Sequence, residues 1–201
     1  MFKILMGELE PDEGSVKWGQ TVTTSYLPKD NTAYFEGCSD SLVDWIRQYS
    51  AKKDDVYLRG FLGRMLFSGE EVFKPVNVLS GGEKVRCMLS RMMLSGANVI
   101  LLDQPTNHLD IAAITTLENL VNAEFRTQRS LVVITHDRQF LDNVSSRIIE
   151  LDRGVLRSYP GKFSEYESRK QEELQAEELA NRRFDKFWAC LLYTSDAADE
   201  L

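Results

Sequence analysis

Residues 79–110 read LSGGEKVRCMLSRMMLSGANVILLDQPTNHLD, and this stretch decides the fold of the chain. Leu79 is followed by Ser80, Gly81 and Gly82, after which Glu83–Leu94 carries apolar residues at helical spacing. Glycines let backbone amides approach a ligand closely, and a helix N-terminus offers an anion free N–H groups and a favourable dipole. The pattern therefore predicts a phosphate site, although the same residues before a helix also suit an ordinary turn and cap.

A fully apolar run, Val99–Leu102, follows this helix and ends in Asp103. Such a run is typical of a buried parallel strand, and an acid at its carboxyl end points toward a ligand site. Asp103 is also suited to the plainer role of a turn or helix cap. Asp110 is placed to cap an amphipathic helix over Ile111–Phe125.

A second apolar run, Leu131–Ile134, leads into Thr135 and His136. The order of strand, helix and strand predicts a right-handed parallel crossover in an α/β sheet. Asp103 and His136 should then emerge at the same edge, where such sheets bind ligands. A lone histidine at this place also suits a core or capping role.

The composition limits the class of protein. The chain has 201 residues with a formal net charge of −7, which argues against nucleic-acid binding through bulk electrostatics but leaves room for a local basic arm. Its three cysteines have no CxxC spacing, so we expect neither a disulfide framework nor a zinc site, and a reducing compartment fits. No apolar run approaches the ~18 residues that span a bilayer. We expect a cytoplasmic protein with no membrane partner.

Other parts of the chain show weaker periodic patterns. Before and after the quoted stretch, some segments carry apolar residues at helical spacing, and others have the alternation and residue types of strands. We expect a short helix beginning at Phe2, strands over Ser15–Trp18 and Thr21–Leu27 with a turn at Gly19, helices over Ser41–Tyr49 and Asp54–Leu66, a hairpin of Arg147–Leu151 and Val155–Tyr159, and an exposed charged helix over Ser164–Trp188.

The combination of the Ser-Gly-Gly segment, the strand ending in Asp103, and PTNHLD about twenty residues later resembles the nucleotide-binding domain of ATP-binding-cassette (ABC) proteins. The sequence LDQPTNHLD points to the ABC-F branch, which is soluble and associated with ribosomes. YPGKFSEY, at Tyr159–Tyr166, also resembles the end of an ABC-F domain, just before its long helical linker. The resemblance covers about residues 1–188.

The resemblance implies a fold, a domain plan and a role for each motif. The fold is α/β, a partial P-loop NTPase-like ABC ATPase domain over 1–163, with a helical subdomain at about 36–95 and the start of an interdomain linker helix at 164–189. Leu79–Glu83 (Ser80, Gly81, Gly82 and Glu83) is implied to be the signature motif, which contacts the γ-phosphate of ATP held by an opposite domain. Asp103 is implied to be the Walker B residue, which holds Mg²⁺ through water. The D-loop would lie at 107–110, with Asp110, and His136 would be the switch histidine.

Two departures concern the ends of the chain. The family's phosphate-binding loop, GxxxxGK[ST], occurs nowhere in the sequence and would stand immediately before Met1. Without its backbone nest and lysine, the chain alone should bind ATP poorly. The last residues, CLLYTSDAADEL, resemble a translated sequencing-library adapter, so we expect 190–201 to be a non-native tail and the chain to be a fragment cut at both ends.

Two further departures lie inside the domain. Gln104 stands where the family usually has the catalytic glutamate, and a neutral amide can orient the attacking water but cannot accept its proton. A natural slow variant, an engineered trap mutant and a sequence error all remain open as its origin. Lys29 occupies the position of the Q-loop glutamine, where an ammonium cannot ligate Mg²⁺. It is suited either to pairing with a phosphate oxygen or to pointing into solvent.

The expected function is that of an ATP-binding and ATP-hydrolysing domain of an ABC-F protein acting on the ribosome in translation. Its cofactors would be ATP and Mg²⁺, and its partners a second ABC domain in the same parent chain and ribosomal RNA reached through the linker. The fragment would supply its signature motif in trans and hydrolyse ATP poorly alone. Two alternatives stay open: the ATPase subunit of an ABC transporter, and a non-catalytic regulatory domain that completes a partner's ATP site.

Overall fold

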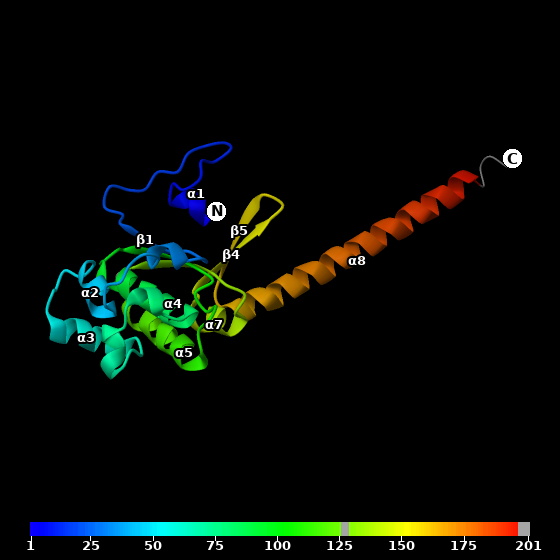
Figure 1. Ribbon diagram of the computed structural model, residues 1–201. Coiled ribbons are helices and arrows are strands. Elements are labelled where there is room, and N and C mark those ends of the chain that lie inside the picture. Colours follow the sequence, from blue (N-terminus) through cyan, green and yellow to red (C-terminus); the bar gives the residue numbers. More distant parts are fainter. Residues whose placement is uncertain (126–128, 197–201) are drawn as a thin grey trace. The chain divides into compact units, whose positions relative to one another are not determined.

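The computed structural model describes residues 1–125 and 129–196 of the chain. They belong to two compact units, Met1–Phe140 and a second unit that begins at Leu141. The first unit is built from strands, α-helices, three short 3-10 helices (η1 to η3) and one π-helical turn (η4), shown in Figure 1. Its elements are α1 (Phe2–Leu5), β1 (Thr24–Leu27), η1 (Thr32–Tyr34), α2 (Leu42–Arg47), α3 (Asp55–Arg64), η2 (Gly69–Phe73), η3 (Val76–Val78), α4 (Gly81–Leu94), β2 (Val99–Asp103), α5 (Ile111–Leu120), η4 (Val121–Phe125) and β3 (Ser130–Ile134).

A three-stranded parallel sheet in the order β1-β2-β3 forms the centre of this unit. Leu27 lies beside Leu102, and Asp103 beside Ile134, so the three strands end at nearly the same level. Three consecutive residues of β2, Ile100–Leu102, are almost fully buried because elements cover both faces of the sheet. The predicted α/β fold with a parallel crossover is confirmed.

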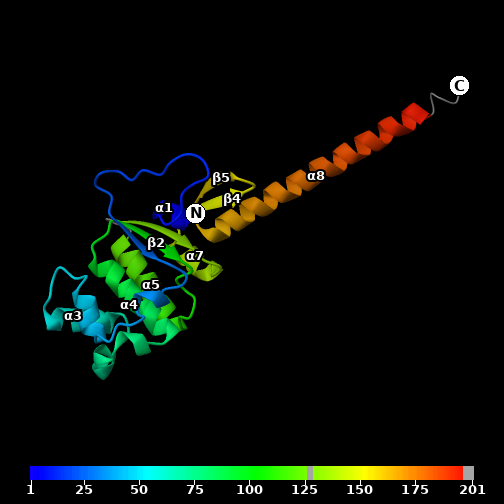
Figure 2. The same ribbon diagram turned by 45° about the horizontal axis from the view of Figure 1, so that its top comes forward.

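Helices lie on both sides of this sheet. Tyr26 and Leu101, which are register partners, form a buried cluster with Phe2 of α1 on one face. Helices α4 and α5 lie on the opposite side in both views (Figures 1 and 2). Alternate residues of a strand point to opposite faces, so Asp103, two positions after Leu101, belongs to the face that carries Tyr26.

The helical segment between β1 and α4 forms its own apolar core. Ser41 caps α2 by accepting from the amide of Asp44, and Asp54 caps α3 by accepting from that of Tyr57. Helix α2 packs against α3, η2 and α4. The two predicted helices are therefore confirmed, each slightly shorter than expected. The residues that fill the shared core are Leu42, Ile46, Leu58, Leu62, Met88 and Met92.

The prediction of a strand over Ser15–Trp18 is wrong. This segment has no strand partner, and Trp18 instead donates its indole N–H to the carbonyl of Leu5 at 2.9 Å. The second predicted strand, Thr21–Leu27, is reduced to β1, because β1 finds its partner in the distant β2 rather than in a local hairpin. The helix that begins at Phe2 ends early at a glycine with positive φ, Gly7 (φ 74°).

The predicted helix over Ile111–Phe125 is confirmed as α5, whose last turn widens into the π-helical η4. Asp110 caps α5 as predicted, since its Oδ1 accepts from the amide of Ala113 at 2.8 Å. A short helix, α7 (Arg138–Val144), follows β3, and Asp137 accepts from the amide of Phe140 near its start.

The second unit contains the predicted hairpin, formed by β4 (Arg147–Asp152) and β5 (Val155–Pro160), and a long helix, α8 (Phe163–Asp196). The carboxylate of Glu150 on β4 accepts from the hydroxyl of Tyr166 at 2.9 Å and pairs with Lys170 at 3.0 Å, which fixes the first turns of α8 to the hairpin. Helix α8 runs past the predicted end at Trp188, because no glycine or proline interrupts it. Of the predicted tail, residues 197–201 lie outside the described residues.

Across the described residues, no helix has both the length and the apolar character needed to cross a membrane.

Candidate functional site

The start of α4 is fixed by a reciprocal pair of hydrogen bonds. The amide of Ser80 donates to Oε2 of Glu83 at 2.7 Å, and the amide of Glu83 donates to the hydroxyl oxygen of Ser80 at 3.4 Å. This capping box satisfies two backbone donors. The amides of Gly81 and Gly82 come first in the helix, where helical geometry supplies no acceptor. They are therefore the donors that an incoming anion would meet.

Glu83 is held by a second partner outside its own helix. Nζ of Lys74 lies 3.3 Å from its Oε1, and the Glu83 side chain is only 15% exposed. Burial pushes the pKa of the Glu83 carboxyl upward, but the hydrogen bonds from Ser80 and the charge of Lys74 outweigh it and hold this pKa below its ordinary value. Glu83 is thus ionised at neutral pH, with one oxygen facing Ser80 and the other facing Lys74.

Gly82 lies close to the segment that follows β2. A Cβ atom placed on Gly82 would lie 2.6 Å from the carbonyl oxygen of His108, whereas one on Gly81 would lie 3.6 Å from the nearest atom of that residue. His108 itself has a positive φ of 65°. Only glycine fits the second position, because the obstructing atom belongs to the backbone.

A cavity of about 280 Å³ opens where these two segments meet. It joins the predicted signature motif to the predicted D-loop. Its lining residues are Ser80, Gly82, Glu83, Arg86, His108, Leu109, Asp110 and Ala113. The structure therefore brings residues of these two predicted motifs together, His108 of the predicted D-loop among them, and adds Arg86, which the sequence patterns did not single out.

A second group of predicted residues lies at the carboxyl edge of the sheet. Lys29 follows β1, Asp103 and Gln104 end β2, and His136 follows β3. The prediction that Asp103 and His136 emerge at the same edge is confirmed by the register of β2 and β3. Asp103 and Gln104 are half-buried, while Lys29 and His136 are exposed.

Gln104 adopts a left-handed backbone conformation with φ of 53°. Its amide donates to the carbonyl of Ile134 at 2.7 Å, and its Oε1 accepts from Nδ2 of Asn107 at 2.8 Å. The hydroxyl groups of Thr106 and Thr135 lie 3.1 Å apart, which ties the same loop to the end of β3 a second time. The side chain at the position of the missing glutamate is thereby oriented by the protein.

Tyr26 is a neighbour of this edge that the motifs did not reveal. Burial raises the pKa of its phenol. The negative charge of Asp103 and the hydrogen bond between Tyr26 and Asp103 raise that pKa further. The available signal was the alternation of parallel strands, which places Tyr26 and Asp103 on one face once the register is known.

The residues at this edge fit Mg²⁺ only in part. Within residues 1–125 and 129–196, no group of three His, Cys, Asp or Glu side chains is placed to hold a metal ion. Asp103 offers a single half-buried carboxylate. In nucleotide sites, Mg²⁺ keeps several waters and is bound through one or two carboxylates together with substrate phosphates. The single carboxylate of Asp103 agrees with this mode of binding and is too few for a site made of protein ligands alone.

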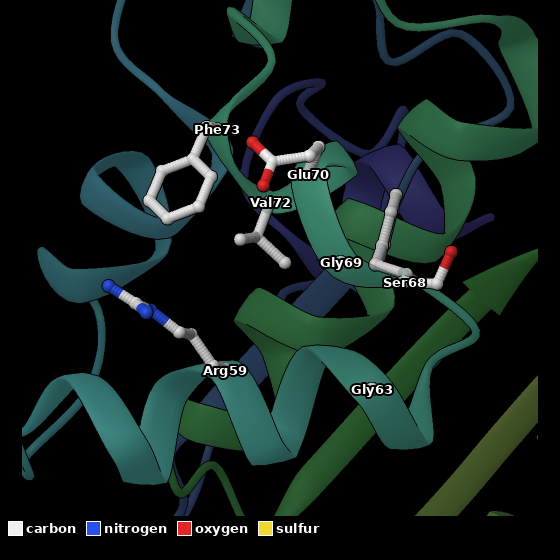
Figure 3. Close-up of a pocket in the computed structure, with 8 residues that line it drawn as sticks. Arg59, Gly63, Ser68, Gly69, Glu70, Val72 and Phe73 are labelled. Carbon is white, nitrogen blue, oxygen red and sulfur yellow. The ribbon is translucent and has the colours of Figure 1, made fainter.

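A larger cavity, of about 590 Å³, lies in the helical segment, between α3 and η2. Figure 3 shows Arg59 of α3 pointing toward Phe73, with Glu70 and Val72 beside them. The guanidinium of Arg59 lies 5.0 Å from the centre of the Phe73 ring. None of the predicted site residues lines this cavity.

These features define an ATP-binding domain of the ABC class. Residues 1–107 match the ABC transporter family, and the chain belongs to that family. The fold agrees, since the chain superposes on the solved RNase-L Inhibitor with a TM-score of 0.63 and 25% identity, covering 80% of this chain and 31% of that one. It also superposes on the archaeal ribosome recycling factor aABCE1, solved with the stalk protein aP1, with a TM-score of 0.67 and 24% identity over 86% of this chain and 34% of that one.

Among curated proteins, the chain is 56% identical to the "Uncharacterized ABC transporter ATP-binding protein YkpA" of Bacillus subtilis over 152 residues, which cover 75% of this chain and 28% of YkpA. It is 33% identical to the "Energy-dependent translational throttle protein EttA" of Escherichia coli K12 over 191 residues, covering 91% of this chain and 33% of EttA. These relatives agree with the predicted ABC-F branch. The chain spans about a third or less of their length.

Proposed function

We propose that this chain is the ATP-binding domain of a protein that acts on the ribosome in the cytoplasm, as the likeness to a translational throttle protein suggests. Leu79–Glu83 would contact the γ-phosphate of ATP held by a second ABC domain of the same parent chain, and α8 would begin the linker that reaches ribosomal RNA. The close approach of Gly82 to His108 supports the role given to Leu79–Glu83. Through this contact, a phosphate bound at the start of α4 would act on the loop that follows Asp103 and Gln104.

At the chain's own edge, each side chain has a task that its chemistry allows. Asp103 would hold Mg²⁺ through water, and the bound metal would neutralise phosphate charge. Gln104, oriented by Asn107, would position the attacking water without accepting its proton. His136 would donate to the γ-phosphate, and exposed Lys29 would pair with a phosphate oxygen. Because the sequence contains no GxxxxGK[ST] segment, hydrolysis by this chain alone would be slow.

One alternative has structural support: a regulatory domain that completes a partner's ATP site. The start of α4 is fully assembled by contacts within the chain, whereas the position of the usual base holds a neutral amide. In this case ribosome binding would not depend on ATP hydrolysis at the site of Gln104.

Mixing experiments test the proposal. The chain is added to a partner ABC domain with a complete phosphate-binding loop, and ATP hydrolysis is measured with wild type and with Ser80→Arg, whose side chain would fill the phosphate position. Stimulation by wild type and its loss in the variant are expected. Equal rates with both would contradict the role of Leu79–Glu83. Sedimentation of the parent protein with ribosomes tests the partner, and recovery of a membrane permease without ribosomes would favour the transporter alternative.

A further inference from the structure

Lys74 joins two Ser-x-x-Glu segments that are separate in the sequence. In the first, the amide and hydroxyl of Ser68 donate to Oε2 of Glu71 at 2.9 and 3.1 Å. In the second, Ser80 and Glu83 form the capping box of α4. Nζ of Lys74 lies 3.5 Å from Glu71 and 3.3 Å from Glu83, so one ammonium is shared by both carboxylates. Lys74 directly follows η2, whose last residue, Phe73, is visible in Figure 3.

This pairing matters because Glu83 stands at the place where an anion would bind. Its carboxylate is in the first turn of α4, beside the free amides of Gly81 and Gly82. An unshielded negative charge there would repel a phosphate and cancel much of the favourable field of the helix N-terminus. The cap therefore conflicts with anion binding unless a cation offsets Glu83.

Arg86, a second positive group beside this cavity, is engaged elsewhere. Arg86 lines the same cavity, but its Nη1 donates to the carbonyls of Met65 and Leu66 at 3.2 and 2.6 Å, and its guanidinium lies over the ring of Phe67. Glu83 is instead paired with Lys74, which raises the pKa of the Lys74 ammonium and keeps it charged.

We propose that Lys74 is a positioning residue of the signature motif: it offsets the charge of Glu83, so that the capped start of α4 accepts the terminal phosphate of a partner's ATP. This inference rests on the proposed function, which it deepens by assigning the charge balance of that site. It gives opposite expectations for the two members of the pair. Removing the lysine charge should weaken phosphate binding, whereas removing the glutamate charge should not.

The test is a titration of the isotope-labelled full chain with inorganic tripolyphosphate, followed by NMR at the amides of Gly81 and Gly82. Lys74→Met should weaken binding about two- to fivefold, the range for one partly exposed charge interaction near a helix end. Lys74→Arg should bind like wild type. Glu83→Gln should bind at least as tightly as wild type, and the double variant Lys74→Met with Glu83→Gln should recover the lost affinity. Lys17→Met, an equal charge change in the exposed segment before β1, serves as the matched control.

Several results would overturn the inference. If the ion pair were purely structural, Glu83→Gln would bind tripolyphosphate as weakly as Lys74→Met does, and the double variant would not recover the affinity. Equal losses in Lys17→Met and Lys74→Met would indicate net charge alone, and the absence of any shift at Gly81 and Gly82 would remove the anion site itself. If Lys74→Met does not fold, Glu83→Gln still decides, because weaker binding by that variant contradicts charge offset.

The proposed function fails separately from this inference. If the wild-type chain stimulates a partner's ATP hydrolysis but Lys74→Met stimulates it with an unchanged half-maximal concentration, the trans role stands and the inference is wrong. If tripolyphosphate binding follows the expected order but no partner is stimulated, the charge balance stands and the trans role is wrong.

Discussion

The start of α4 and the carboxyl edge of the sheet are both assigned to ATP by the family, yet they are built differently. At the start of α4, hydrogen bonds, an ion pair and a backbone approach fix nearly every group before any ligand arrives. At the sheet edge, Lys29 and His136 are exposed on separate loops. Gln104 is oriented there by a side-chain bond to Asn107, and Asp103 by its hydrogen bond with Tyr26. The motif that would serve a partner's nucleotide is pre-organised, whereas the groups at the chain's own edge would need a bound nucleotide to bring them together.

The largest expected effect concerns the edge. In a parent chain that carries a complete phosphate-binding loop, Gln104→Glu should raise the rate of ATP hydrolysis by about 10²–10⁴-fold, because it restores a carboxylate that accepts the proton of the attacking water. Asn107 is placed to orient that carboxylate as it orients the amide. Steady-state phosphate release measures the change, with Gln104→Ala as the control. An unchanged rate would show that another residue acts as the base.

Gly82→Ala should lower the stability of the protein, because it changes the pre-organised start of α4. The new Cβ would meet the carbonyl oxygen of His108 at 2.6 Å, so the backbone must shift, at a cost of about 1–3 kcal/mol. Gly81→Ala is the matched control, since its Cβ would lie at ordinary contact distance. Thermal unfolding should show a lower Tm for the first variant alone. Equal Tm values would mean that the two segments are not in tight contact.

The capping box should also give the protein a pH dependence. Because the folded pKa of Glu83 is below its ordinary value, its contribution to stability is present above about pH 4.3 and is lost as the pH falls through the lower folded pKa. Glu83→Gln lacks this contribution. Denaturant unfolding at pH 7 and in acid should therefore show a stability gap between wild type and Glu83→Gln that closes in acid. A constant gap would argue against an ionised Glu83 that is stabilised by Ser80 and Lys74.

The smallest effect on stability is expected at the edge. His136 is exposed, so His136→Ala should change the free energy of unfolding by less than about 0.5 kcal/mol. In a parent chain that carries a complete phosphate-binding loop, the same change should lower ATP turnover. A marked loss of stability would show that His136 supports the fold, and the contrast between a rigid signature region and a loosely held edge would then fail at this residue.

Much of the fold could be predicted because it depends on local patterns. The apolar runs that became β2 and β3, the helix after Ser80, and the cap Asp110 all follow from side-chain periodicity and capping chemistry. The prediction of a strand over Ser15–Trp18 was wrong because a strand needs a partner. The neighbouring strand, β1, pairs instead with a segment 75 residues away in sequence, since Thr24 lies beside Val99. Sequence periodicity carries no information about such pairings.

The candidate site divides in the same way. The sequence by itself determined which residues are the candidates for the chemistry of the site: the Ser-Gly-Gly segment, Asp103, the neutral Gln104 and His136. Each of them belongs to a short run with fixed spacing. Only the tertiary structure placed the carbonyl of His108 against Gly82, brought Tyr26 to Asp103, and set Lys74 between Glu71 and Glu83. The physical reason is range: spacing along a strand or helix fixes the neighbours of a residue within a turn or two, whereas a close backbone approach or a shared charge exists only after distant segments have packed.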